Sequence, residues 1–420
     1  MARLPRIQGR KVQDAGRTAC GLRRSLLRPA LVSLMGLLGA GSLAAIRTTP
    51  GTEGHPPEDR PATAEARALA DHSERRLRRG QDLEAKLFLE RASIDPSDIG
   101  ALERAERASR NVRKIRIGVA ALMARRHPRV DRLEELVHSI SLTLHRRGVR
   151  LQRDGGNALF VEIFDEPRPH PGSLGATLEP AYWIDCDGAV ILIRAILEEY
   201  ARRVRIDLDR VAVLSASDHM ALVLHDPEGV ARVLELRPAN WSPGEPPGMR
   251  LLPFETYRLA YLARGEEPRL LKGWGELLTN TWEVSAARLL SRGLPEKALA
   301  WAEEAGRQAP ESVHPRLTAA LALRDLGRFD QAAERLQSLV SRGVKSAKLY
   351  LALASVEMAA GRAHSALRAA DEAISLRPEL PLAYHRRAEI LRAMGDEAGA
   401  SVDAATFRSL TGASAVGDRD

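Results

Sequence analysis

Apolar positions recur at helical spacing in the part of the chain ahead of residue 150. Residues 64–91, 98–126 and 129–147 each place apolar side chains three and four positions apart, which is typical of amphipathic helices. The next apolar run, residues 157–164 (NALFVEIF), predicts a strand. Proline and glycine then indicate a loop over residues 165–181. The pattern thus predicts helices that lead into a region with strands.

From residue 182 onward the pattern alternates between helical and strand periods. A charge-poor stretch that starts at Cys186 repeats its apolar residues with helical period, and Asp185 is a residue type that caps helix N-termini. The elements expected next are strands over 210–214, 219–225 and 230–236, a turn over 226–229 and a helix over 255–263.

The expected hairpin brings two polar residues together. With a turn over residues 226–229, His219 is expected opposite residue 235 or 236, so Glu235 lies within one residue of facing it. A cysteine therefore opens a helix, a histidine opens a strand, and a carboxylate lies on the partner strand. A helix N-terminus favours the thiolate form of cysteine, because the helix dipole and free amide groups stabilise negative charge.

A glycine and an alanine recur at a constant spacing of 34 residues in the last third of the chain. The glycine suits the left-handed turn that ends a helix, and the small alanine lets a second helix cross close to the first. Pro310 and Pro378 each follow a glycine by seventeen residues and are placed to end the second helix. The recurring residues are Gly293, Gly327, Gly361 and Gly395, followed by Ala298, Ala332, Ala366 and Ala400.

This pattern resembles four tetratricopeptide (TPR) repeats over about residues 279–414. Two positions depart from the family: the second repeat ends at residues 342–344 without a proline, and Phe407 stands where a small residue is usual and is expected to cap the array. The resemblance implies an all-α solenoid whose concave face binds a protein or peptide. Candidate groove residues, with a solvated surface as the alternative, are Arg324, Arg328, His364 and Arg386.

Length and charge limit the possible functions. A chain of 420 residues predicts two or three domains. The net charge is +8, but residues 1–28 carry eight basic residues against Asp14 alone. The rest of the chain is therefore close to neutral, and it shows no basic run with interleaved aromatic residues. We expect no nucleic-acid partner.

The basic segment leads into an apolar one. Residues 29–46 carry no charge, residues 22–27 (LRRSLL) resemble a twin-arginine export signal, and residues 42–44 offer a small-x-small cleavage pattern. Both a cleaved signal peptide and an uncleaved membrane anchor fit these features. The expected location is the periplasm or cell envelope, with membrane contact only through this segment.

The chain has two cysteines, Cys20 in the basic leader and Cys186 in the middle region. Two cysteines exclude a disulfide framework and a zinc site built on cysteines. Three roles remain open for Cys186: a buried core thiol, one half of an intermolecular disulfide bridge, or a nucleophile. Asp185 and Asp187 flank it without a histidine cluster, so no metal and no cofactor is expected.

The cysteine, histidine and carboxylate follow the chain order of the transglutaminase-like superfamily. Residues 185–187 (DCD) resemble the G-D-C-D-D motif of bacterial members, and His219 before an alternating strand resembles their H-A-W-x-E-V strand. Over about residues 129–240 the resemblance implies that Cys186 is the nucleophile, His219 the base and Glu235 the orienting carboxylate. Three positions depart from the family: Ile184 replaces its glycine, Met220 and Ala221 replace its aromatic position, and Glu replaces Asp.

The sequence predicts an α+β transglutaminase-like domain followed by an all-α TPR solenoid. The expected function is cysteine-dependent acyl transfer or hydrolysis of peptide amides, with the repeats recruiting substrate or partner; the alternative is a non-catalytic scaffold for protein–protein interaction. The expected segments are a leader (1–46), a linker (47–63), the transglutaminase-like domain with its N-terminal helices (64–262), a connector (263–278), the repeats (279–414) and a tail (415–420).

Overall fold

The computed structural model describes residues 61–151, 159–168, 180–216, 219–235, 250–262, 268–271, 273–310 and 312–411. The expected leader, most of the linker and the tail lie outside these ranges, as does most of the loop expected over residues 165–181. Among the helices of the described ranges, none is both long enough and apolar enough to cross a membrane.

From residue 61 to the first strand, the described chain forms the helices α3 (Pro61–Arg78), α4 (Asp82–Ala92), α5 (Ile99–Arg126) and α6 (Leu133–Arg146). The single helix expected over residues 64–91 is wrong, because the chain turns between α3 and α4. Gly80 has a φ of +64°, and its N–H donates to the Leu77 carbonyl at 2.8 Å. A left-handed residue at this point ends α3 and lets α4 fold back beside it.

The strand expected over residues 157–164 is also wrong. Residues 157 and 158 lie outside the described ranges, and Phe160–Ile163 forms the short helix α7. Phe160 and Val161 are buried against α4 and α5, and the Val161 N–H donates to the Glu90 carboxylate at 3.1 Å. A short apolar run fits a buried helix as well as a strand, and here packing between two helices decides.

The strands form two sheets. Strands β1 (Val149–Leu151) and β2 (Tyr182–Ile184) form a parallel pair. The larger sheet is antiparallel and has the order β6-β5-β4-β3-β7. The strands of this larger sheet are β3 (Val211–Ser215), β4 (Met220–His225), β5 (Ala231–Glu235), β6 (Arg250–Pro253) and β7 (Arg269–Leu271). The strands expected over residues 210–214, 219–225 and 230–236, with the turn between the last two, are thereby confirmed to within two residues.

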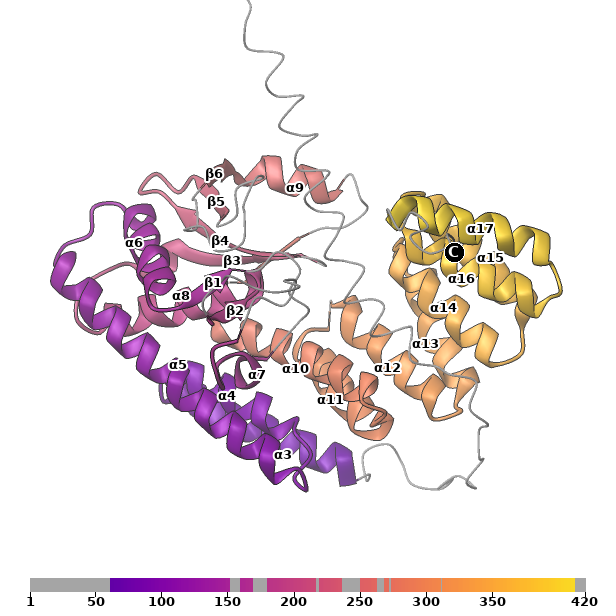
Figure 1. Ribbon diagram of the computed structural model, residues 1–420, viewed down its shortest axis with the longest axis horizontal. Coiled ribbons are helices and arrows are strands. Elements are labelled where there is room, and N and C mark those ends of the chain that lie inside the picture. Colours follow the sequence, from indigo (N-terminus) through magenta and orange to yellow (C-terminus); the bar gives the residue numbers. More distant parts are fainter. Residues whose placement is uncertain are drawn as a thin grey trace, which may run out of the picture.

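The larger sheet lies between helices (Figure 1). Helix α8 (Cys186–Ala201) packs with α5 and α6 against the face that carries Leu222 and Leu234. Helix α9 (Phe254–Leu262) lies over the other face, where Tyr257 packs on Val233. The alternating burial of successive strand residues follows from the two-residue period of a strand.

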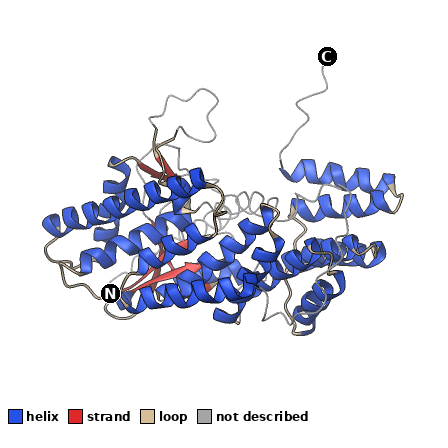
Figure 2. Ribbon diagram, turned by 90° about the horizontal axis from the view of Figure 1, so that it is seen from below, coloured by secondary structure: helices blue, strands red, loops and turns tan. Residues whose placement is uncertain are grey.

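The described C-terminal part is an all-α repeat (Figures 1 and 2), made of four helix pairs from α10 to α17. The four glycines have φ between +74° and +86°, and the four alanines that follow them are fully buried, as the spacing predicts. The second pair ends at Gly343, which also has a positive φ of +81°. The helices are α10 (Trp274–Ser291), α11 (Pro295–Gln308), α12 (Val313–Asp325), α13 (Phe329–Ser341), α14 (Ala347–Ala359), α15 (Ala363–Leu376), α16 (Pro381–Ala393) and α17 (Glu397–Thr411).

The boundary of the repeat differs from the expected one at its start. Helix α10 begins at Trp274 rather than near residue 279, and β7 occupies part of the expected connector. Helices α3 and α4 also pack on the first helix pair, with α3 against α11 and α4 against α10. Gly80 precedes the buried Ala85 by five residues, the same spacing as in the four later pairs. The α3–α4 hairpin therefore covers the N-terminal end of the array, as a capping unit does.

Candidate functional site

Cys186 is the first residue of α8. The Asp185 carboxylate caps this helix by accepting a hydrogen bond from the Gly188 N–H at 2.8 Å, as the sequence predicts. The Cys186 side chain is partly exposed, and its thiol donates to the Asp187 carboxylate at 3.3 Å. The thiol thus lies where the helix N-terminus stabilises negative charge, with one carboxylate in direct contact.

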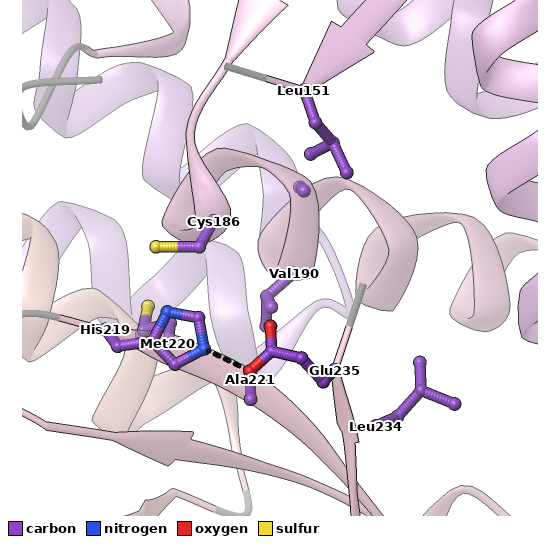
Figure 3. Close-up of a pocket in the computed structure, with 9 residues that line it drawn as sticks. Leu151, Cys186, Val190, His219, Met220, Ala221, Leu234 and Glu235 are labelled. Atoms are coloured by element: carbon purple, nitrogen blue, oxygen red, sulfur yellow. Dashed lines mark ion pairs between the residues drawn. The ribbon is translucent and has the colours of Figure 1, made fainter. Parts of the chain in front are cut away.

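His219 and Glu235 lie at the same end of the larger sheet. His219 immediately precedes β4, and its carbonyl accepts a hydrogen bond from the Ala216 N–H at 2.9 Å. The His219 Nε2 and Glu235 Oε2 atoms are 3.3 Å apart, with both side chains mostly buried. This is the ion pair marked in Figure 3.

The register that joins these two residues differs from the expected one. Leu222 pairs with Leu234, so the same ladder brings Glu235 across from Ala221 rather than across from His219. His219 is two residues before Ala221 and therefore points to the same face of the sheet. The contact is a diagonal one, which is within reach of long side chains.

Cys186 joins the pair from the helix. His219 lies between Cys186 and Glu235, and the charges of both act on it; in Figure 3 the ring nitrogen that does not face Glu235 lies on the side of Cys186. Burial by itself would lower the pKa of His219, but Glu235 and Cys186 outweigh that effect and raise it well above its ordinary value. The surroundings therefore favour the imidazolium form of His219 beside the Glu235 carboxylate.

A small pocket opens beside these three residues. Its wall is largely apolar, and its polar lining consists of the three side chains already described (Figure 3). The apolar contributions come from Leu151, Ala189, Val190, Met220, Ala221 and Leu234. The pocket thus places a thiol, an imidazole and a carboxylate beside an apolar wall.

Two contacts at this site were not predicted from the sequence. The Tyr257 hydroxyl of α9 donates to Glu235 Oε2, and Asp187 accepts from the thiol. Asp187 stands in the quoted motif, so its position was a usable signal for a contact with Cys186. Tyr257 has no such signal, because its contact depends on how α9 crosses the sheet.

The structure offers no cluster for a metal ion in its described ranges, where no group of three or more His, Cys, Asp and Glu side chains converges. Asp185, one of the two carboxylates beside Cys186, serves as the helix cap.

The candidate groove residues do not all lie together. Arg324 in α12 and Arg386 in α16 are partly buried, each with a partner carboxylate: Asp325 at 2.6 Å and Glu389 at 2.7 Å. Burial and the positive charge of Arg324 lower the pKa of Arg386 against the opposing effect of Glu389. His364 is instead an exposed residue at the start of α15.

Comparisons with known proteins show limited likeness. No family model and no curated protein matches the chain, so neither supports the resemblance to the transglutaminase-like superfamily. A solved structure of MamA from Desulfovibrio magneticus RS-1 is 14% identical, with 32% of this chain and 76% of that chain covered and a TM-score of 0.28. A crystal structure of MamA is 18% identical over 32% of this chain and 79% of that chain, also with a TM-score of 0.28. Scores this low carry no argument about function.

Proposed function

We propose that this chain binds a protein or peptide segment on the inner face of its helical repeat. The first helices of successive pairs, α10, α12, α14 and α16, contact one another in order. They therefore form a continuous row along which an extended segment or a helix can lie. This row is the observation that carries the proposal.

The charge on this row suggests the chemistry of the partner. Arg324 and Arg386 come from two different helices of the row, and the charge of one lowers the pKa of the other. Arg324 also donates to the Ser355 hydroxyl of α14, which lies between them in sequence. Asp325 and Glu389 already pair with these guanidinium groups, and a further carboxylate from an acidic segment would offset the repulsion that still lowers the pKa of Arg386.

Peptide binding by the full chain tests this role. Fluorescence anisotropy with a labelled acidic peptide and its basic counterpart should show binding of the acidic one, weakened about tenfold or more by Arg324→Glu with Arg386→Glu. The control is Arg335→Glu, since Arg335 is an exposed residue of α13, outside the row. Equal binding of both peptides, or equal loss in the control, would contradict the proposal.

A second candidate function is cysteine-dependent acyl transfer or hydrolysis of peptide amides. The observation that favours it is the convergence of Cys186, His219 and Glu235 beside one pocket. In this proposal the Cys186 thiolate attacks an amide carbonyl carbon and forms a C–S bond. The His219 imidazolium gives its proton to the nitrogen as the C–N bond breaks, and Glu235 holds the ring.

The resulting thioester is then released by water or by an amine. His219, now neutral, takes the proton of the incoming nucleophile, and the thiolate leaves. With water the product is an acid, and with an amine it is a new amide. The resemblance to the transglutaminase-like superfamily is the reason to consider both acceptors.

The rate of Cys186 alkylation separates the binding role alone from binding combined with catalysis. The full chain with Cys20→Ser has one thiol, and iodoacetamide should label it quickly below pH 7. An ordinary thiol with a pKa near 8.5 is almost wholly protonated at pH 6, so His219→Ala should slow labelling on the order of 100-fold there. Slow labelling that His219→Ala does not change would refute the catalytic proposal and leave the binding role.

Residues 1–46 lie outside the described structure, and we propose that they direct export or hold the chain at the membrane. Support comes from the basic residues ahead of an uncharged stretch at residues 29–46. Replacing Arg23 and Arg24 with lysine should reduce export, measured by cell fractionation. Unchanged export would contradict the twin-arginine interpretation.

A further inference from the structure

Tyr257 contacts both members of the ion pair at the end of the sheet. Its hydroxyl donates to Glu235 Oε2, the same oxygen that lies 3.3 Å from His219 Nε2. Its ring lies nearly parallel to the His219 imidazole, with 6.1 Å between ring centroids and an angle of 27° between the planes. Tyr257 is 1% exposed, so water does not compete for these contacts.

We propose that Tyr257 is a positioning residue, which fixes the Glu235 carboxylate so that His219 presents its other nitrogen to Cys186. This inference rests on the proposed cysteine chemistry. A glutamate side chain has one more rotatable bond than aspartate, and the family resemblance placed an aspartate here. A hydroxyl donor on the oxygen that His219 approaches restricts that extra freedom, since the carboxylate must keep the hydrogen bond from Tyr257 and the ion pair with His219 in one conformation.

The phenol is suited to this role because it stays protonated. Burial, followed by the charge of Glu235, raises the pKa of Tyr257 well above its ordinary value. Its hydroxyl therefore stays protonated at neutral pH and donates to the Glu235 carboxylate there. Helix α9 brings Tyr257 to Glu235 from the face of the sheet opposite α8 (Figure 1).

The test is the pH profile of Cys186 alkylation in the full chain with Cys20→Ser. Tyr257→Phe keeps the ring and removes the donor, and it should slow labelling at pH 6 about tenfold, since a hydrogen bond to a charged group is lost. The acidic limb of the profile should move to higher pH.

The matched control is Tyr200→Phe. Tyr200 is also fully buried, and its hydroxyl donates to the His127 carbonyl. It lies fourteen residues along α8 from Cys186, about 20 Å at 1.5 Å per residue. This variant should lose a similar hydrogen bond and keep the alkylation profile, so a shift in both variants would indicate a general loss of packing and overturn the inference.

A double-variant cycle then asks whether Tyr257 acts through Glu235. With Glu235→Gln already present, adding Tyr257→Phe should change the alkylation rate less than twofold. A full tenfold effect in that background would overturn the inference. If His219→Ala leaves labelling unchanged, the cysteine proposal itself fails; if it slows labelling and Tyr257→Phe does not, only the role of Tyr257 fails.

Discussion

The repeat and the sheet region use buried positions in different ways. In the repeat the buried alanines recur every 34 residues, and the buried carboxylates Glu304, Glu357 and Asp403 each pair with a more exposed arginine. The sheet region instead encloses His219, Glu235 and Tyr257 in mutual contact. Burial of polar groups is costly unless they are paired. The sheet region meets this cost with partners that are themselves buried, whereas in these ion pairs of the repeat one partner reaches the surface.

The two regions nevertheless share two helices. Helix α4 places Leu83 and Leu87 in the core beside the sheet and Leu89 in the core of the repeat. Helix α10 places Trp274 in the core beside the sheet and Trp282 in the core of the repeat. We therefore expect the regions to unfold together rather than as independent domains.

The largest expected effect is on that shared stability. Trp282 is fully buried, with its ring centroid 4.4 Å from that of Trp301. Trp282→Ala should lower the free energy of unfolding by about 3 to 5 kcal/mol, because it leaves a cavity in the repeat core. Urea unfolding followed by circular dichroism measures the loss, and Cys186 labelling reports the sheet region at each urea concentration.

Both probes should report one transition at the same lowered midpoint. The control is Leu259→Ala, since Leu259 is 61% exposed and should change stability by less than about 0.5 kcal/mol. A lower midpoint by circular dichroism alone, with Cys186 still labelled at pH 6 at the rate of the folded chain, would show that the regions unfold separately.

The next effect concerns the sheet region and depends on pH. Because the folded pKa of His219 is raised, its imidazolium stabilises the fold fully below the unfolded value near 6.5. That contribution is lost as pH rises through the folded pKa. Glu235→Gln removes the main charge that raises the pKa of His219. The variant should therefore be less stable than the parent by about 1 to 3 kcal/mol at pH 5.5.

Urea unfolding at steps from pH 5.5 to 9.5 checks the sign. The difference in the free energy of unfolding between parent and variant should become smaller as pH rises. A difference that widens with pH would show that His219 is held neutral in the folded protein.

These contrasts explain which parts of the fold the sequence predicts. The helix ends of the repeat depend on local chemistry, a glycine that adopts positive φ and an alanine five residues later, so a fixed spacing reveals them. The α3–α4 hairpin has the same pair in Gly80 and Ala85 but lies far from the other four in sequence. No period connects it to them, and the contact with α10 and α11 comes only from the fold.

The candidate site was predictable to the level of residue types and order. Cys186 with its cap at Asp185 follows from a local pattern, and His219 and Glu235 follow from a hairpin. The register could not be fixed, since a shift of two residues keeps every side chain on its face and β4 (MALVLH) is buried on both faces. The contact of Tyr257 depends on how α9 packs across a sheet, which no local pattern encodes.

A smaller effect tests whether a glycine with positive φ is needed where a helix of the repeat ends. Gly327 has a φ of +74°, and a Cβ there would meet no atom within 4 Å. Gly327→Ala should therefore cost about 1 to 2 kcal/mol from the backbone alone. Gly306 lies within α11, where a Cβ makes only an ordinary contact at 3.8 Å, so Gly306→Ala should stabilise by up to about 1 kcal/mol. Thermal unfolding of both variants measures the difference, and equal effects would contradict the assigned role of Gly327.

The smallest effect separates reactivity from stability at Cys186. Asp187 accepts a hydrogen bond from the thiol at 3.3 Å and lies in the first turn of α8. Its charge opposes the thiolate and also favours the helix dipole. Asp187→Asn should therefore speed alkylation of Cys186 at pH 6 about threefold to tenfold, while it lowers the free energy of unfolding by about 0.5 kcal/mol.

The control for the effect on the free energy of unfolding is Glu296→Gln. Glu296 is an exposed residue in the first turn of α11, so its loss should lower stability by a similar amount without changing the alkylation rate. If Asp187→Asn slows alkylation, the carboxylate assists the thiolate through another group, and the balance of charges assigned to this helix end is wrong. If alkylation is faster while stability falls, the Asp187 charge has the two opposite effects assigned to it, on the reactivity of Cys186 and on the stability of the helix.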